Sequence, residues 1–456
     1  MSRRIAAGAL IALGFVMTVL VVAGWGGLGA MSRMMALPEG SAVETAALPP
    51  PAAAVGAATE RLLALVLASP AGTEITDLLA PVAVLVASGA FEVRIAAPAR
   101  VAVPLTGGID LLPDITLDEP ALGQRPVALV VVPLLLDASN PEIVAGLQRL
   151  AAAGAHVLSV CEGARTVAAA GLFEGLPATT HFFVLDSLAK AHPGVAWRSG
   201  VRFIAGERVS SSAGVTAAID ATLDVVRRLA GPAAARRAID RLGLIERLQI
   251  QAPAEFDLSE IGVLLLGAGF GGSPAQVGVV VPAGVDELQL AALLDLQPRS
   301  FRAEPRTLSL APGWLTSRHG LRLRARGVLG EAVGLDELVV AAGDDDGAAL
   351  TAARALASRD GLPLEDLAGV VPGRSFDHVL DGLATRSDVM TARVAAEMVE
   401  WPWQTARESS AADDGPRAWA WPAALRALAW GAGGAALVAW WLGRSRRRLA
   451  QAERRG

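Results

Sequence analysis

The chain has 456 residues, which is enough for two to three domains at about 150 residues each. Its formal charge of −5 and the lack of a basic face with interleaved aromatics exclude a nucleic-acid surface from our expectations. The single cysteine, Cys161, excludes an internal disulfide and a cysteine-rich metal site, and we expect neither a metal nor a cofactor. A lone thiol is either a buried small side chain or a reactive group, and its neighbours must decide which.

The first element is an apolar run from Ile5 to Leu28, preceded by Arg3 and Arg4. A run of roughly 20 apolar residues is long enough to cross a bilayer. The alternative is a cleaved signal peptide, whose apolar region usually spans about 7 to 15 residues. This run is longer and no Ala-x-Ala cleavage site follows it, so the sequence predicts an uncleaved transmembrane anchor over residues 1–30. Residues 31–59 are rich in Ala, Pro and Gly and are predicted to be a linker.

Segments of strand and helix character alternate through residues 60–232. The strand-like segments are rich in Val, Leu and Ile with little alternation, as are strands buried on both faces of a parallel sheet. They are Leu62–Ala68, Phe91–Ala96, Val127–Pro133 and His156–Val160. The helical segments are Thr76–Ala87, Pro141–Ala153, Arg165–Ala170 and Val215–Leu229. This order predicts an α/β sandwich.

Four motifs follow one another in this region. They are Gly72-Thr-Glu-Ile-Thr-Asp77 with Pro81, Ser159-Val-Cys-Glu-Gly-Ala164, Ala168-Ala-Ala-Gly-Leu-Phe-Glu-Gly175 with Ala178-Thr-Thr-His181, and Ser211-Ser-Ala-Gly-Val-Thr-Ala-Ala-Ile-Asp220. Together they resemble the ThiJ/PfpI family of the class I glutamine-amidotransferase-like superfamily. The resemblance is greatest to the amidase-like domains of AraC-type regulators and to isonitrile hydratases. It implies a flavodoxin-like three-layer sandwich with a parallel sheet over residues 60–232.

Cys161 ends a strand-like segment, and Gly163 opens the next turn. A sharp strand-to-helix turn exposes its side chain, and the small residue lets the backbone bend. The helix N-terminus beneath the thiol favours the thiolate, so we expect a lowered pKa for Cys161, with amides near Gly163 to stabilise an anion. An ionised Asp77 or Glu162 would work against this and raise the pKa. The alternative is a buried structural cysteine.

The resemblance adds two residues to this site. Asp77 takes the family's carboxylate position near the thiol, where it would share a proton with Cys161 or hold a water. The alternative is that Asp77 is a solvated acid at the start of a helix. His181 falls where many members place a histidine that acts as a base or orients the thiol; the alternative is a surface histidine at a strand end. Glu162 stands where the proteolytic branch carries histidine, which weakens a peptidase assignment.

A further departure from the family follows the strand Val127–Pro133. Many members have a glycine pair there, and its amides help to form the oxyanion site. This sequence has Leu134-Leu-Leu instead, which narrows the pocket and argues against efficient acyl chemistry.

After a connector over residues 233–275, residues 276–400 repeat landmarks of the first domain. The matched pairs are Pro70-Ala-Gly72 with Pro282-Ala-Gly284, and Val127–Pro133 with Leu335–Ala341. The repeat has no cysteine, and Gln289 stands where Asp77 stands in the first domain. We therefore predict a degenerate second ThiJ/PfpI-like α/β copy, which forms an internal pseudo-dimer with the first or pairs within a homo-oligomer.

Two features of this part imitate functional sites. His319 has no companions at ligand spacing, so we interpret it as a loop histidine between two strands. The run Gly267-Ala-Gly-Phe-Gly-Gly272 follows a strand-like segment and resembles a dinucleotide fingerprint, but Ser273, Pro274 and another strand follow it instead of a helix. We expect a flexible inter-domain joint there.

The C-terminal elements are a linker over residues 401–421, a transmembrane helix over residues 422–443 and a basic tail over residues 444–456. Tryptophans cluster around the apolar stretch, as interfacial aromatics do; the alternative is a buried core helix. Arginines precede the first span and follow the second, so the positive-inside rule puts both termini in the cytoplasm. We expect a cell-membrane protein with extracytoplasmic soluble domains.

Two hypotheses of function follow. In the first, the protein is a cysteine-dependent hydratase, hydrolase or lyase for a small electrophile, in which Cys161 attacks while Asp77 and His181 manage protons. In the second, it is a membrane-anchored small-molecule-binding or sensor module with a reactive cysteine. The leucine run and the copy without a thiol favour the second, because a fold does not fix a function. The expected partners are the lipid bilayer and an unknown small molecule, and not nucleic acid.

Overall fold

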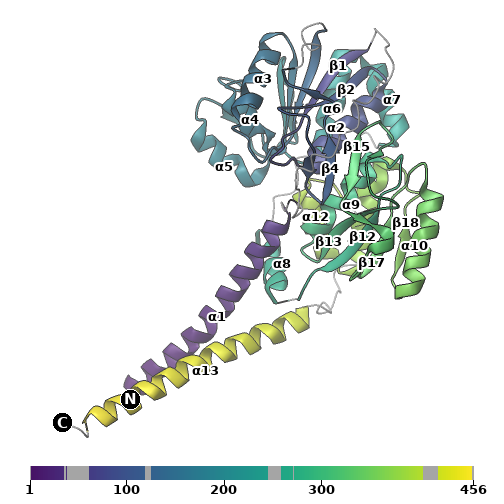
Figure 1. Ribbon diagram of the computed structural model, residues 1–456. Coiled ribbons are helices and arrows are strands. Elements are labelled where there is room, and N and C mark those ends of the chain that lie inside the picture. Colours follow the sequence, from purple (N-terminus) through teal and green to yellow (C-terminus); the bar gives the residue numbers. More distant parts are fainter. Residues whose placement is uncertain are drawn as a thin grey trace.

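The computed structural model describes residues 2–34, 37, 61–118, 125–244, 258–270, 272–403 and 420–453. Figure 1 shows two globular halves and a stalk of long helices that extends away from them. Most of the linkers predicted at residues 31–59 and 401–421, and the last three residues of the predicted basic tail, lie outside the described residues.

The first half is built on a seven-stranded sheet with the order β10-β11-β7-β6-β1-β2-β5. Its strands are β1 (Leu62–Leu67), β2 (Phe91–Ala97), β5 (Ile115–Thr116), β6 (Val127–Val132), β7 (His156–Val160), β10 (Phe203–Ile204) and β11 (Val209–Ser212). All neighbours are parallel except β10 and β11. The central strands β1, β6 and β7 are buried on both faces, which explains their continuous Val and Leu runs.

Helices cover both faces of this sheet. On one face lie α2 (Ile75–Ser88), α6 (Ala217–Ala230) and α7 (Pro232–Leu242). On the other face lie α3 (Pro141–Ala152), α4 (Ala164–Ala169) and α5 (Phe182–Ala191). The short strands β8 (Pro177–Ala178) and β9 (Ala196–Trp197) pair beside these three helices. The start of α3 follows from its sequence, because Asn140 accepts hydrogen bonds from the amides of Glu142 and Ile143. The predicted flavodoxin-like three-layer α/β sandwich is confirmed.

The second half has a five-stranded parallel sheet with the order β16-β13-β12-β17-β18. Its strands are β12 (Ala275–Val280), β13 (Ala303–Ser309), β16 (Gly327–Val328), β17 (Glu337–Val340) and β18 (Leu364–Asp366). The helices of this half are α9 (Glu287–Arg299), α10 (Asp346–Asp360), α11 (Ser375–Arg386) and α12 (Val389–Met398). Taken in chain order, these strands occupy the same relative sheet positions as β1, β2, β5, β6 and β7.

The two halves share a four-stranded sheet with the order β14-β15-β4-β3. The first half supplies β3 (Val103–Leu105) and β4 (Ile109–Leu112), and the second supplies β14 (Leu315–Thr316) and β15 (Arg322–Ala325). The buried Asp110 of β4 forms ion pairs with Arg324 and Arg326 across this junction. Helices α2 and α9 pack against each other beside it, so the second half contacts the first through both a sheet and a helix pair.

The stalk consists of α1 (Ser2–Met34) and α13 (Ala420–Glu453). Each contains a stretch that is long and apolar enough to cross a bilayer, Ala9–Arg33 in α1 and Ala423–Arg444 in α13. The helices lie side by side, and both chain ends are at the far tip of the stalk (Figure 1). Glycines permit this contact, since a Cβ at Gly14 would lie 2.6 Å from the side chain of Val438.

Helix α8 (Leu258–Phe270) corrects an expectation, because residues 264–270 were predicted as a strand end and a flexible glycine joint. It packs along α1, where a Cβ at Gly26 would lie 2.1 Å from the Cα of Gly269. The glycines thus serve close helix packing, which the local sequence does not encode. Arg426 of α13 donates a hydrogen bond to the Phe270 carbonyl (3.0 Å) at the C-terminal end of α8.

Candidate functional site

Cys161 lies at the predicted strand-to-helix elbow. Strand β7 ends one residue earlier, and a single turn of 3-10 helix (Cys161–Gly163) leads into α4. The φ angle of Cys161 is 54°, in a left-handed region that residues other than glycine rarely adopt. Gly163 fits tightly against β6, because a Cβ there would lie 2.0 Å from the Val132 carbonyl oxygen. The strand, the turn and the close glycine contact of the elbow are therefore as the sequence predicts, whereas the predicted exposure of the side chain is wrong.

The thiol at this elbow is not an exposed nucleophile, since Cys161 is 4% exposed. Burial, together with the charges of Asp77, Glu162 and Glu74, raises the pKa of Cys161 well above its usual value. The prediction of a lowered pKa is wrong for this state. The short helix α4 supplies only a weak dipole, and desolvation with the nearby acids outweighs it. Glu162 itself pairs with Arg165 at 2.8 Å.

Asp77 is fully buried in the first turn of α2. The Glu74 side chain caps this helix by accepting a hydrogen bond from the Asp77 amide (2.6 Å). Asp77 Oδ2 accepts from the Leu134 amide (3.1 Å), whereas Oδ1 has no hydrogen-bond partner among the described residues. Burial, with the charge of Asp295, raises the pKa of Asp77 to about 7. Near neutral pH, a large share of molecules therefore carries a proton there, and the Leu134 amide is committed to Asp77 instead of an oxyanion.

His181 directly precedes α5 and is 3% exposed, so it is not a surface histidine at a strand end. Its Nε2 lies 3.2 Å from the Met398 carbonyl oxygen, in the second half. Burial, followed by the charge of Arg299, lowers the pKa of His181 to about 3, so the ring is neutral and donates to that carbonyl. The adjacent Thr180 hydroxyl donates to the Cys161 carbonyl (2.9 Å) and ties this segment to the elbow.

The second half adds a buried ion cluster that sequence reasoning missed. Arg299 of α9 contacts Asp295 at 2.7 Å and Glu74 at 3.4 Å, and the Thr76 hydroxyl donates to Asp295 (2.9 Å). Arg299 is the positive charge that partly offsets the acids around Cys161. The sequence carried a signal for this pair, because Asp295 and Arg299 stand four residues apart in a leucine-rich segment, and residues at this spacing lie on one helix face.

The segment after α12 covers the site. The Val399 carbonyl accepts hydrogen bonds from the Thr216 amide (3.1 Å) and hydroxyl (2.7 Å). Glu400 is 3% exposed with a φ of 53°, and burial, with the charge of Asp77, raises its pKa to about 7. Its carboxyl carbon lies 2.5 Å from where a Cβ on Gly214 would stand. The sequence placed Glu400 only at the boundary between the predicted second copy and a linker.

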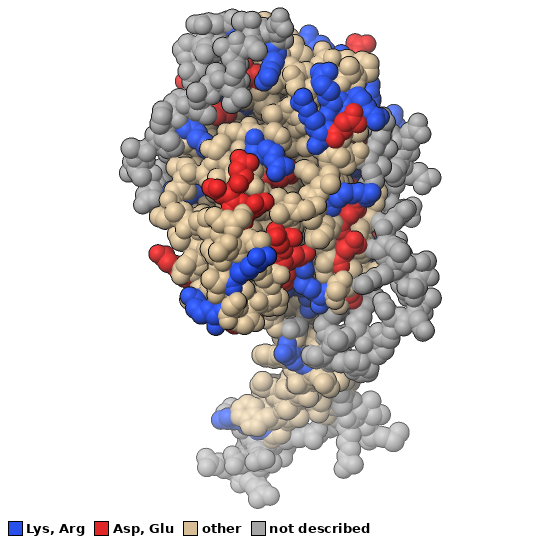
Figure 2. All heavy atoms as spheres, turned by 90° about the vertical axis from the view of Figure 1, so that its right-hand side faces the viewer, with Lys and Arg blue, Asp and Glu red and all other residues tan. Residues whose placement is uncertain are grey.

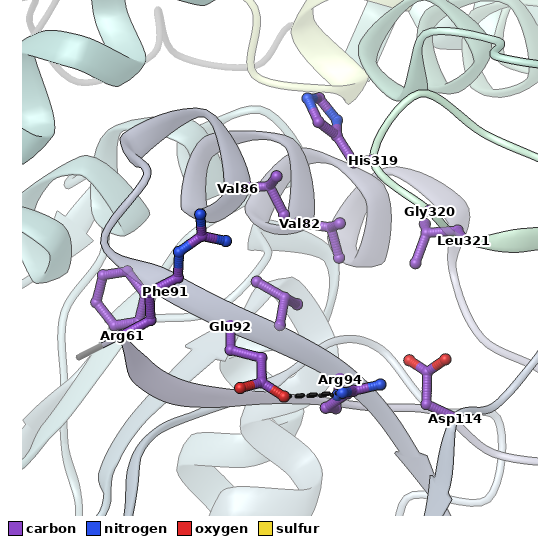
Figure 3. Close-up of a pocket in the computed structure, with 11 residues that line it drawn as sticks. Arg61, Val82, Val86, Phe91, Glu92, Arg94, Asp114, His319, Gly320 and Leu321 are labelled. Atoms are coloured by element: carbon purple, nitrogen blue, oxygen red, sulfur yellow. Dashed lines mark hydrogen bonds and ion pairs between the residues drawn. The ribbon is translucent and has the colours of Figure 1, made fainter. Parts of the chain in front are cut away.

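A separate hollow of about 50 Å³ lies between α2, β2 and the turn before β15 (Figure 3). It has room for a few waters at about 10 to 15 Å³ each. Glu92 and Arg94 of β2 pair there at 2.8 Å. His319 lies at its edge between β14 and β15, as predicted, and pairs with the buried Glu287 at 2.6 Å. Within the described ranges, no group of three or more His, Cys, Asp and Glu side chains could hold a metal ion.

Comparison with known proteins places this elbow within a family match. Residues 63–228 match the DJ-1/PfpI family. Over 97 residues the chain is 32% identical to the HTH-type transcriptional regulator CdhR of Pseudomonas aeruginosa. That match covers 21% of this chain, and the chain spans only 29% of the length of that relative.

Solved structures are similar as well. A ThiJ/PfpI family protein from Pseudomonas syringae is 26% identical with a TM-score of 0.35, and the match covers 39% of this chain and 73% of that one. A mutant DJ-1 superfamily protein from Salmonella typhimurium is 25% identical with a TM-score of 0.36, covering 40% and 98%. An AraC family transcriptional regulator from Pseudomonas putida is 21% identical with a TM-score of 0.35, covering 40% and 98%.

Proposed function

Because this chain contains a DJ-1/PfpI family domain at residues 63–228, we propose that it is a membrane-anchored module that binds or senses a small molecule at a closed site around Cys161. The burial of the thiol carries the proposal. A catalytic cysteine needs access and a thiolate, whereas Cys161 is 4% exposed and burial raises its pKa. A thiol kept covered and protonated suits a site that responds when it is opened.

A sensing role agrees with the matched relative, which by its name is a transcriptional regulator. In this chain the residues after the family match form a second α/β half and a long apolar helix. We propose that the site communicates with the stalk helices and not with DNA. On the face seen in Figure 2, acidic and basic side chains are interspersed, which does not create the single-sign field that steers nucleic acid.

We place α1 and α13 across the cell membrane. Three observations support this: the length and composition of their apolar stretches, their glycine-mediated contact, and the position of both chain ends at one tip of the stalk. Arg3, Arg4 and the arginines after the apolar stretch of α13 would then lie in the cytoplasm by the positive-inside rule. The two globular halves would be extracytoplasmic.

We also infer that residues 276–400 are a degenerate copy of the family domain. Gln289 supports this, because it repeats the contacts of Asp77. The backbone amide of each residue donates a hydrogen bond to the side chain of the acid three positions earlier. Each side chain also accepts a hydrogen bond from the amide that closely follows a central strand, Leu134 after β6 and Ala342 after β17.

The strand register supports the same inference and locates the lost thiol. Val132 of β6 pairs with the residue two positions before Cys161, and Val340 of β17 pairs with the residue two positions before Ala368. An alanine therefore takes the place of the cysteine. A copy that keeps the frame without the thiol serves to complete and cover the site in the first half.

The alternative is a cysteine-dependent hydratase, hydrolase or lyase that acts on a small electrophile. The strained backbone of Cys161 favours it, because strain gathers at reacting residues. Asp77 favours it as well, since a carboxyl with a pKa of about 7 can exchange a proton with a substrate near neutral pH. In this alternative, the site would have to open before Cys161 could attack.

The titration of Cys161 separates the two functions. Because the chain has one cysteine, alkylation of the detergent-solubilised full chain by iodoacetamide reports this thiol alone, with Cys161→Ser as the blank. We expect the rate, followed by intact mass against pH, to have a midpoint above the free-thiol value of about 8.5. A midpoint below about 7.5, in the range of activated cysteines, would refute the closed site and favour the enzyme.

A further inference from the structure

Residues 398–403, which we call the strap, run from the end of α12 over the site in the first half. Apart from its first residue, which ends α12, the strap has no regular secondary structure, yet most of it is buried. The exposed fractions are 1% for Met398, 3% for Glu400, 8% for Trp401 and 6% for Trp403. A buried irregular segment needs partners for its backbone. The strap amides donate to carbonyls of α12 and of the strap itself, whereas the partners of its first three carbonyls come from the DJ-1/PfpI domain.

Three consecutive strap carbonyls accept hydrogen bonds from that domain. The donors are His181 Nε2 to Met398 (3.2 Å), the Thr216 amide and hydroxyl to Val399 (3.1 and 2.7 Å), and Arg202 Nη1 to Glu400 (2.6 Å). These donors bind three successive carbonyl oxygens through contacts that do not depend on the side chains attached to them. The end of α12 and the turn after it therefore occupy these donors as the carbonyl groups of a ligand would.

Glu400 places a carboxyl group at the centre of this contact. It lies two residues after α12, in the left-handed position at which glycine is usual, and the next amide, of Trp401, donates to the Ala396 carbonyl (2.8 Å). Its Oε2 is buried and has no hydrogen-bond partner among the described residues, and the same is true of Asp77 Oδ1. Buried polar atoms are normally paired, so Asp77 Oδ1 marks a place where a polar group of a ligand would be bound once Glu400 has left with the strap.

The second half holds the strap by its tryptophans. Trp401 stacks on Phe376 with ring centroids 5.1 Å apart, and its Nε1 donates to Asp377 (2.7 Å). Trp403 donates to Asp381 (3.1 Å), also on α11. A cavity of about 10 Å³, large enough for one water, remains between the strap and α6. The two tryptophan side chains thus fix the strap to the second half, while its carbonyl groups bind the first half.

We propose that the strap is an internal ligand that closes the Cys161 site, and that the external ligand which displaces it is a small acidic compound with carbonyl groups in series, such as a short acidic peptide. The inference rests on the proposed function, in which this site binds a small molecule. It adds the chemical class of that molecule and the segment that competes with it.

The test weakens the strap without touching its carbonyl contacts. Trp401→Ala combined with Trp403→Ala removes the anchors on α11, and the full chain is alkylated with iodoacetamide at pH 8 in detergent. We expect labelling of Cys161 at least ten times faster than in the wild type. A synthetic peptide of residues 398–403, added in excess, should return the rate toward the wild-type value. The same peptide with lysine in place of its glutamate should not.

Trp197→Ala is the matched control. Trp197 donates to the His192 carbonyl (3.2 Å) and packs on Phe173 (5.9 Å), and it makes no strap contact among those described. Its labelling rate should equal that of the wild type. A double variant that melts cooperatively but labels at the wild-type rate overturns the proposal. So does a faster rate that the peptide of residues 398–403 fails to suppress.

If the double variant loses its cooperative melt, Trp403→Ala alone replaces it, because this change removes the hydrogen bond to Asp381 and leaves the stack of Trp401 on Phe376 in place. Faster labelling then supports the strap, and an unchanged rate overturns it. Failure of the proposed function can be distinguished from failure of the strap proposal, because it appears in the alkylation titration of Cys161 in the wild type as a midpoint below about 7.5. The strap is judged only by the ratio of variant to wild-type rates.

Discussion

Cys161 and Glu400 are two residues with positive φ that belong to the same buried region but to different halves of the chain. Their φ angles are 54° and 53°, in a region that disfavours side chains with a Cβ. Glycine at either position would relieve the strain, so the thiol and the carboxyl are present at a cost to stability. Strain of this kind is characteristic of functional sites and persists only where the surrounding packing enforces it.

The raised pKa of Glu400 predicts how stability varies with pH. Its carboxyl titrates at about 7 in the folded chain, against an ordinary 4.5. The unfolded chain therefore loses this proton first, and the free energy of unfolding falls as the pH rises from about 4.5 to about 7. In Glu400→Gln this loss is absent. Its Tm in detergent, followed by tryptophan fluorescence, should exceed that of the wild type by roughly 4 °C or more at pH 8 and approach it at pH 4.5.

Asp186→Asn is the control for this effect, since Asp186 is an exposed acid on α5. Its Tm should follow that of the wild type at both pH values. Asp77 and Arg202, the charges that act on Glu400, are unchanged in both variants. A Tm difference between Glu400→Gln and the wild type that is the same at pH 4.5 and pH 8 would show that the Glu400 carboxyl is not protonated in the folded chain.

At the scale of elements, one apolar cluster joins the stalk to the strap. It includes Ala30 near the end of α1, Leu264 of α8, and Val394 and Met398 of α12. The same Met398 accepts the hydrogen bond from His181 through its carbonyl. Packed helices transmit displacements because well-packed interiors resist deformation. A shift of α1 would therefore reach the strap through α8 and α12.

Leu264→Ala tests this connection. Leu264 is fully buried, and its truncation should cost about 2 to 5 kcal/mol of stability and loosen α12. We expect a lower Tm together with faster alkylation of Cys161. Leu356→Ala is the control, because Leu356 of α10 is 6% exposed in a different apolar cluster. It should lower the Tm without changing the labelling rate. Equal labelling rates in the two variants would refute a path from α8 to the site.

Elements that are defined by their own sequence were predictable. Strand β7 was predicted with its observed bounds, His156–Val160, because a strand buried on both faces has a continuous apolar sequence. Helix α8 was not predicted, because its glycines are typical of a flexible joint and their role in packing against α1 depends on the tertiary structure. The position of Cys161 followed from the elbow, but its raised pKa did not, because desolvation depends on what covers the thiol.

At the scale of the whole molecule, the site is assembled from segments far apart in the chain. The contact of Thr76 with Asp295 spans 219 residues, and that of His181 with Met398 spans 217. Local patterns identified Cys161, Asp77 and His181 through a family resemblance. They could not show which face of the second half would meet them. The candidate site was therefore predicted as far as the family domain reaches, and its cover was not.

The central claim is that the resting protein keeps Cys161 out of reach, and its most direct measurement is a protection factor. The factor is the alkylation rate of a synthetic peptide of residues 156–166 at pH 8, divided by the alkylation rate of the thiol in the folded full chain at the same pH. We predict a ratio of about 100 or more, since the thiol reacts only when the strap opens. A ratio below about 3, in a preparation whose circular dichroism shows it to be folded, would contradict the account.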